Sequence, residues 1–154
     1  MLIFLDIDGV MVPAASWKSP QILEDGFPMF SQKATDALVS LISDDTTVVL
    51  TTSHKSNYTL GEWKSIFEKR KIKIDKLQCL DSNEDNLNRK EEVLRWFNSN
   101  VNIEDFIIID DDKSLNSLPA FLKKRLILTS SLIGLTQEHL LQVEAIHSHD
   151  LELA

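Results

Sequence analysis

Short apolar runs that alternate with helical patterns constrain the fold of this chain more than any other feature. Isoleucine and valine dominate three of the runs, and continuous apolar runs are typical of strands buried on both faces of a parallel sheet. Five such strands are expected, at Leu2–Leu5, Thr47–Thr51, Lys76–Leu80, Phe106–Ile109 and Leu126–Leu128.

Helical patterns fill the intervals between these runs. They begin after Ser31 and after the capping-box pair Thr59 and Glu62, and they cover Arg89–Phe97, Ser117–Lys124 and Thr136–Ile146. The alternation of strands and helices predicts an α/β fold with a mainly parallel five-stranded sheet. All 154 residues are expected to form one domain, with a loose tail over about residues 147–154.

The net charge and the cysteine content restrict the class of protein. A formal net charge of −8 disfavours broad, sequence-independent binding to nucleic acid or to anionic membranes, although it leaves room for a local basic groove. The single cysteine cannot form an internal disulfide, and Asp6 breaks the first apolar run before it reaches the length of a signal peptide. No apolar stretch is long enough to span a bilayer. We therefore expect a cytoplasmic protein that does not bind membranes.

Polar side chains follow three of the expected strands, and parallel α/β sheets bind ligands at the edge where these strand ends meet. Any one of these residues is common at a strand end. Together, however, up to five carboxylates would repel one another unless a cation lies between them. Oxygen ligands select a hard cation, of which Mg²⁺ is the usual one. The residues are Asp6 and Asp8, then Thr51, Thr52 and Ser53, then Asp110, Asp111 and Asp112.

The spacing of these residues suits phosphoryl transfer. Asp6 and Asp8 are two residues apart and share a face in extended chain, so one can attack a phosphorus atom while the other exchanges protons with the leaving oxygen and with water. Gly9 permits a sharp turn directly after them. The hydroxyl of Thr51 can donate to a phosphoryl oxygen, and Lys90, at the start of the helix before the fourth strand, can add positive charge.

In this order, the motifs resemble the four-motif signature of phosphatases of the haloacid dehalogenase (HAD) superfamily. The resemblance covers nearly the whole chain and implies a three-layer α/β/α fold. The motifs read Asp6-Ile7-Asp8-Gly9-Val10, Val48-Val49-Leu50-Thr51, Lys90, and Ile107-Ile108-Ile109-Asp110-Asp111.

The resemblance assigns a catalytic role to four residues. It implies that Asp6 is the nucleophile that becomes aspartyl phosphate, and that Asp8 is the acid/base. Thr51 and Lys90 would hold the phosphoryl group. An acid/base at Asp8 implies phosphoryl transfer and not dehalogenation.

The same resemblance implies a Mg²⁺ site. Asp6 and the backbone carbonyl of Asp8 would contribute to it, and a carboxylate of the fourth motif would complete it, with Asp111 preferred to Asp110. Thr52 is the alternative to Thr51 in the phosphoryl site, which Gly9 would also line.

The order of the motifs separates this family from another fold with similar residues. Bacterial receiver domains also use acidic residues, Thr and Lys around Mg²⁺, but there Thr and Lys follow the second acidic group, whereas here they precede it.

The intervals Val10–Thr46 and Asp81–Asp105 are too short for an inserted cap domain, so the protein is expected to be capless, with a short flap over about residues 11–30.

An open site admits large phosphorylated substrates, such as a polynucleotide end or a phosphoprotein segment. The chain also resembles the small HAD domains of nucleic-acid repair proteins, through Thr51-Thr52-Ser53-His54-Lys55 and Gly134-Leu135-Thr136. The flap aromatics Trp17, Phe27 and Phe30 are expected mainly to cover the core, but they and the charges of Lys55 or Lys69–Lys73 could also contact a polymer. The alternatives are a phosphatase of small metabolites and a non-catalytic phosphate-binding or regulatory module.

Overall fold

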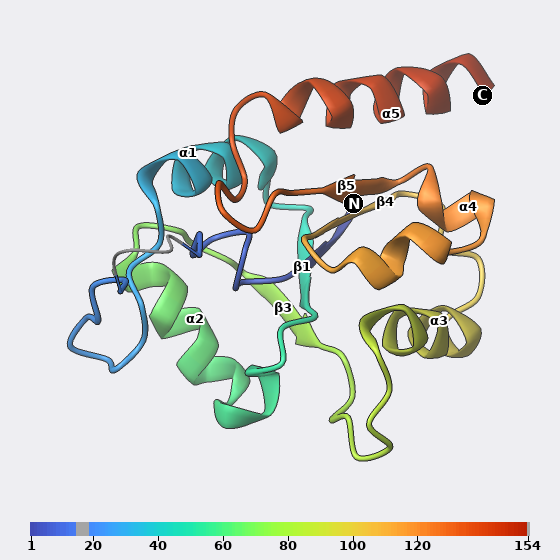
Figure 1. The fold of residues 1–154 in the computed structure, drawn as a ribbon. Helices are drawn as coiled ribbons and strands as arrows, with labels where there is room; N and C mark the ends of the chain where they lie inside the picture. The colour runs from blue at the N-terminus through green and yellow to red at the C-terminus, as the bar shows by residue number, and fades with distance from the viewer. Residues whose placement is uncertain (15–18, 154) are drawn as a thin grey trace.

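The computed structural model describes residues 1–14 and 19–153 and confirms the α/β fold. Its sheet has five strands, all parallel, in the order β3-β2-β1-β4-β5 (Figure 1). Each strand lies on a predicted apolar run, with ends that differ by at most one residue. The bounds are Leu2–Leu5 for β1, Thr47–Leu50 for β2, Lys76–Cys79 for β3, Phe106–Asp110 for β4 and Leu126–Leu128 for β5.

The register of the central strands brings their carboxyl ends to one level. Leu5 of β1 lies opposite Leu50 of β2 and Ile109 of β4. The amide of Asp6 donates to the carbonyl of Ile109 over 3.1 Å, and the amide of Thr51 donates to the carbonyl of Leu5 over 2.9 Å. The first polar residues after the strands are therefore neighbours across the edge of the sheet.

Two of the helices begin at the caps that the sequence predicts. Ser31 accepts a hydrogen bond from the amide of Ala34, and Thr59 forms a capping box with Glu62. Caps of this kind satisfy amides that have no partner in the first helical turn. The helices are α1 Gln32–Leu41, α2 Leu60–Lys69, α3 Arg89–Ser99, α4 Ala120–Lys123 and α5 His139–Leu153, with short 3₁₀ turns η1 Lys55–Asn57 and η2 Lys113–Ser117.

The two faces of the sheet carry different helices, which gives the three layers. Side chains alternate along a strand, so Ile3 and Leu5 of β1 pack with α1, α2 and α5, whereas Phe4 packs with α3, η2 and α4. Figure 1 shows the same division, with α1, α2 and α5 on one side of the sheet and α3 and α4 on the other. Both faces of the central strands β1, β2 and β4 are buried, which explains why these strands read as continuous apolar runs. The edge strand β3 differs, because its Lys76 and Gln78 are exposed.

The C-terminal segment differs from the expected loose tail, because α5 continues as a helix to Leu153. Val143 is buried in the core, and Nη2 of Arg125 lies 2.5 Å from Oδ1 of Asp150. These contacts lie on the face of the helix that turns toward the sheet. None of the described helices is both long and apolar enough to cross a bilayer.

The segment between β1 and α1 contains no helix or sheet strand among its described residues. Phe27 and Phe30 of this flap are buried, so they cover the core and are not free to stack on a substrate. Trp17, the third flap aromatic, lies outside the described residues.

Candidate active site

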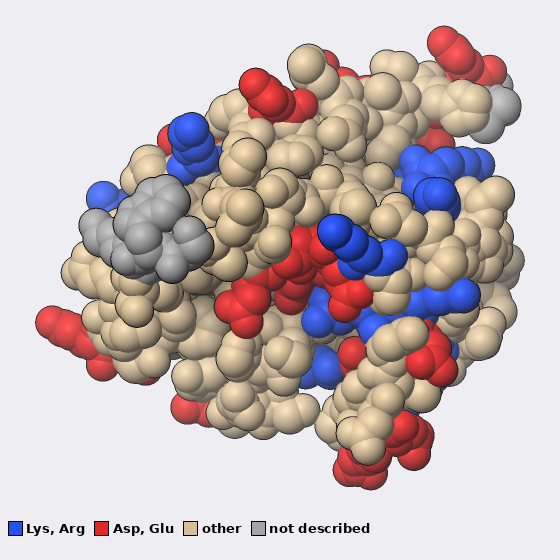
Figure 2. All heavy atoms as spheres, in the orientation of Figure 1, with Lys and Arg blue, Asp and Glu red and all other residues tan. Residues whose placement is uncertain are grey.

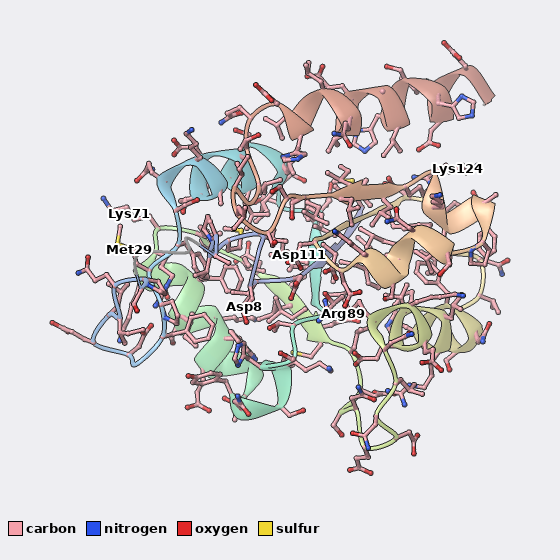
Figure 3. All side chains as sticks on the ribbon, in the orientation of Figure 1. Asp8, Met29, Lys71, Arg89, Asp111 and Lys124 are labelled. Carbon is pink, nitrogen blue, oxygen red and sulfur yellow. The ribbon has the colours of Figure 1, made fainter. Side chains whose placement is uncertain are left out.

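Three aspartates converge at the carboxyl edge of the sheet. One carboxylate oxygen from each of Asp6, Asp110 and Asp111 lies within 4.8 Å of the others. Figure 2 shows acidic atoms gathered at the centre of this face with basic atoms beside them, and Figure 3 places Asp8, Asp111 and Arg89 around the same point. Asp6, Asp110 and Asp111 are called the acidic cluster below.

Burial makes the acidic cluster electrostatically unfavourable. Asp110 is fully buried and Asp6 is 4% exposed. Burial, reinforced by the neighbouring Asp110, raises the pKa of Asp6 to about 9, and burial also raises the pKa of Asp111. Asp6 is therefore held protonated at neutral pH unless more positive charge is present. A set of carboxylate oxygens fits a hard divalent cation such as Mg²⁺, which would supply that charge.

Arg89, the first residue of α3, is the basic side chain that the fold brings to the cluster. Its Nη1 lies 2.5 Å from Oδ2 of Asp110, 3.4 Å from Oδ1 of Asp6 and 3.2 Å from Oγ1 of Thr51. Burial lowers the pKa of Arg89, but the neighbouring Asp110 and Asp6 outweigh this effect and raise the pKa above its usual value. Sequence reasoning missed this residue and chose its neighbour.

Lys90 is placed differently. It is half-buried, and its backbone amide donates to Oγ of Ser114 over 3.2 Å. Within the described residues, its ammonium makes no hydrogen bond or ion pair. The sequence signal for Arg89 is its place in the first turn of α3. Lys90 shares that turn, so the signal does not distinguish the two residues.

Of the two candidate threonines, Thr51 lies at the cluster. Its Oγ1 donates to Oδ2 of Asp110 over 3.2 Å and accepts from Arg89. Thr52 is also buried, but its Oγ1 accepts from the amide of His54 and so bonds its own loop. Thr51 is thus the hydroxyl beside the carboxylates, in the position that the sequence indicated.

Gly9 fits its position because the chain turns against the cluster there. Its φ of +79° suits glycine, and a Cβ at this position would lie 2.0 Å from Oδ2 of Asp111. Its carbonyl accepts a hydrogen bond of 2.7 Å from Oγ1 of Thr129, at the end of β5. Close approach of the first loop and the fourth motif therefore requires a residue without a side chain.

Asp8 and Asp112 lie apart from the acidic cluster. The side chain of Asp8 is 60% exposed, and its Oδ2 lies 2.8 Å from Nε2 of His54. Asp112 turns to accept from the amide of Ser114, which caps η2, and its own amide donates to Oδ1 of Asp110. Asp8 therefore stays largely exposed to solvent beside His54, whereas Asp112 is bound within its own turn.

A buried ion pair between Lys55 and Glu92 lies next to Arg89. Nζ of Lys55 lies 2.7 Å from Oε2 of Glu92, and both side chains are about 5% exposed or less. Oε1 of Glu92 lies 3.8 Å from Nε of Arg89. Lys55 is thus neutralised inside the protein and is not placed to contact a polymer. No pattern in the sequence predicts this pairing, since the two residues come from η1 and α3.

The described part of the flap is fixed to α2 by Arg70. Its Nη1 lies 2.6 Å from Oδ2 of Asp25, and its Nε and Nη2 donate to the carbonyls of Pro28 and Phe27. Hydrogen bonding to Arg70 lowers the pKa of Asp25 to about 2. The ring of Phe27 then packs edge-on against the imidazole of His54, with centroids 6.0 Å apart.

Comparison with known proteins gives a match to a protein family. The family described as "HAD domain in Swiss Army Knife RNA repair proteins" matches residues 2–140, from β1 to the first turn of α5. Neither the curated proteins nor the solved structures give a match. The matched range covers most of the chain and includes the acidic cluster, Thr51 and Arg89. The chain therefore belongs to the family of HAD domains found in Swiss Army Knife RNA repair proteins.

Proposed function

We propose that this protein is a Mg²⁺-dependent phosphomonoester hydrolase that works through aspartyl phosphate on Asp6. The observation that carries the proposal is the sheet register, which sets Asp6 between Thr51 and Asp110. Family membership supports a HAD-type hydrolase in general terms. The donor set of the acidic cluster supports the metal.

The proposed reaction has two steps at phosphorus. A carboxylate oxygen of Asp6 attacks, the ester P–O bond breaks, and Asp8 gives its proton to the leaving oxygen. Water then attacks the phosphorus of the acyl phosphate and passes a proton to Asp8, which releases inorganic phosphate and restores the Asp6 carboxylate. A bound Mg²⁺ supplies charge that stabilises the ionised Asp6 and the phosphoryl oxygens. Asp6, Asp110 and Asp111 would hold it, with the backbone carbonyl of Asp8.

Arg89 is proposed as the fixed cation of the phosphoryl site. It lies beside Thr51 and Asp6, and an arginine presents several donors in a planar fork that suits phosphoryl oxygens. Lys90 remains a proposed second cation, whose flexible side chain starts one residue further along α3. Arg89→Met should therefore lower the rate more than Lys90→Met, and the reverse order would restore Lys90 as the main phosphoryl ligand.

The proposed substrate is a phosphorylated nucleic-acid end. The family description names RNA repair proteins, and the described part of the flap contains no element that could close over a small molecule. Because Lys55 is paired and Phe27 is buried, contacts to a polymer must come from exposed groups, such as Lys69, Lys71 and Lys73, whereas Arg70 between them is buried against Asp25. Such binding should weaken as salt is raised, because it depends on contacts between lysines and phosphates, and the net charge of −8 opposes it.

Hydrolysis of an aryl phosphate tests the reaction itself. Activity should vanish with chelator, return with Mg²⁺, and be lost in Asp6→Asn, because an amide is a poor nucleophile and a weaker metal ligand. Asp112→Asn is the matched control, since asparagine can still cap η2. Wild-type rates in Asp6→Asn would refute the mechanism.

Competition between substrates tests the substrate class. A phosphorylated RNA oligonucleotide should exceed ribose phosphate and a phosphopeptide in kcat/KM at low salt, and its advantage should shrink at moderate salt. A preference for the free sugar phosphate or for the peptide would reject the nucleic-acid proposal and leave the phosphatase proposal standing.

A further inference from the structure

The carboxyl group of Asp8 has a single side-chain partner among the described residues. Asp6 and Asp110 are buried and contact Arg89, whereas the side chain of Asp8 is 60% exposed and its Oδ2 meets only Nε2 of His54, at 2.8 Å. An exposed side chain samples several rotamers in solution unless a partner selects one. The contact with His54 is therefore the interaction available to fix the orientation of this carboxyl.

His54 is itself held from two sides. Its backbone amide donates to Oγ1 of Thr52 over 3.2 Å, directly after β2. Its imidazole meets the ring of Phe27 at an interplanar angle of 89°, an edge-to-face arrangement that aromatic pairs prefer. Phe27 in turn packs edge-on against Trp63 of α2, with centroids 5.4 Å apart. The backbone of His54 is thus held within the loop after β2, and its imidazole, which is 40% exposed, packs on one side against the flap.

The flap that carries Phe27 is fixed as well. Nη2 of Arg70 donates to the carbonyl of Phe27 over 2.8 Å, and the same guanidinium pairs with Asp25 two residues earlier. A continuous set of contacts therefore runs from α2 through Arg70, Phe27 and His54 to Asp8.

We infer that His54 is a positioning residue for the acid/base Asp8. Nε2–H of His54 donates to Oδ2 of the Asp8 carboxyl group, so that in the first step Oδ1 carries the proton for the leaving-group oxygen, and in the second step the ionised Oδ1 accepts the proton of the attacking water. General acid–base catalysis depends on such placement, because the proton donor must lie within hydrogen-bond reach of its target. This inference rests on the proposed phosphatase function and adds a residue that neither the four motifs nor the family match assigns.

The test compares two leaving groups. A nitrophenolate leaves without help from an acid, whereas an alkoxide needs a proton, so kcat/KM for an alkyl phosphate depends on Asp8 far more than kcat/KM for nitrophenyl phosphate. His54→Ala should lower the alkyl-to-aryl ratio of kcat/KM by about tenfold or more. His54→Gln, whose side-chain amide can donate from a similar position, should recover part of that ratio. His149→Ala, an exposed histidine of α5, should change nothing.

A double-mutant comparison separates positioning from a general structural effect. In an Asp8→Asn background, His54→Ala should cause no further fall in the alkyl-to-aryl ratio, because the group that it positions is gone. The inference is overturned if His54→Ala lowers both substrates equally, if it raises KM for both with unchanged kcat, or if its effect persists in Asp8→Asn. A wild-type protein without activity on either substrate would refute the proposed function instead, which keeps the two failures distinct.

Discussion

Two arginines of this protein, the buried Arg70 under the flap and the partly buried Arg89 at the acidic cluster, illustrate how the same side chain serves different purposes. Arg70 faces one carboxylate, Asp25, and three backbone carbonyls, of Phe27, Pro28 and Ile66. Its charge is balanced and its donors are satisfied, as a structural clamp requires.

Arg89 faces a different environment. It lies among Asp6, Asp110 and Glu92, with Asp111 beside them, so carboxylates outnumber guanidinium groups. The buried Lys55 offsets Glu92, but the acidic cluster still has more negative charge than Arg89 can neutralise. The charges around Arg70 are therefore balanced, whereas those around Arg89 are not. The unbalanced charges lie at the edge of the sheet where a cation and a phosphoryl group are proposed to bind.

Removing the clamp should have the largest effect on stability. Arg70→Met leaves Asp25 and three carbonyls without their donor, and breaking a buried pair in this way costs about 3–5 kcal/mol. Urea unfolding measures the loss, with Lys73→Met as control, because its pair with Asp75 is exposed and contributes little. A loss below that of an ordinary surface substitution would show that the flap is not clamped as described.

Adding a methyl group at Gly9 should break the acidic cluster without touching the clamp. Gly9→Ala places a Cβ 2.0 Å from Oδ2 of Asp111 and should lower phosphatase activity by about a hundredfold, the effect of a displacement of about 1 Å. Gly26→Ala is a close control, because Gly26 has a φ of +80° but nothing within 4 Å of a Cβ. Equal losses in both variants would assign the effect to backbone strain and not to Asp111.

The two regions should respond to pH with opposite sign. The pKa of Asp6 is raised to about 9, so the folded protein binds the extra proton between about pH 4 and 9, and the free energy of unfolding of the metal-free protein falls as pH rises through that window. The pKa of Asp25 is lowered to about 2, so its contribution is present above about pH 4 and is lost as pH falls through 2.

Denaturation at a series of pH values measures both effects. From pH 6 to 8, Asp6 should lower the free energy of unfolding by up to about 1.4 kcal/mol per pH unit. Asp6→Asn should remove this slope, and saturating Mg²⁺ should suppress it in the wild type. Asp25→Asn should instead remove only the acid-side dependence. A slope that survives in Asp6→Asn would place its origin elsewhere.

The smallest expected effect is the stabilisation by Mg²⁺ itself. A cation that binds only the folded state should raise the free energy of unfolding by about 1.4 kcal/mol at ten times its Kd. Thermal unfolding should show the shift in wild type and in Arg70→Met, but not in Asp111→Ala. Asp112→Ala should keep most of it, because Asp112 caps η2. Loss in Asp110→Ala alone would make Asp110 the ligand and Asp111 a neighbour.

The sequence by itself determined the framework and the level of the site. Continuous apolar runs specified the buried parallel strands, and the caps at Ser31 and Thr59 specified where two helices begin. Parallel pairing then brings the residues after each strand to one edge, so the sequence predicts that Asp6, Thr51 and Asp110 lie together. These features follow from local periodicity and from the rules of strand pairing.

Tertiary structure decided which side chains serve the site. Arg89 and Lys90 share one helical turn, and adjacent helix residues point in different directions, so only the angle at which α3 packs on the sheet brings Arg89 to the cluster. The approach of Gly9 to Asp111, the burial of Lys55 against Glu92 and the contact of His54 with Asp8 likewise join segments that are distant in sequence. Such contacts depend on how whole elements pack, and no local pattern in the sequence encodes that packing.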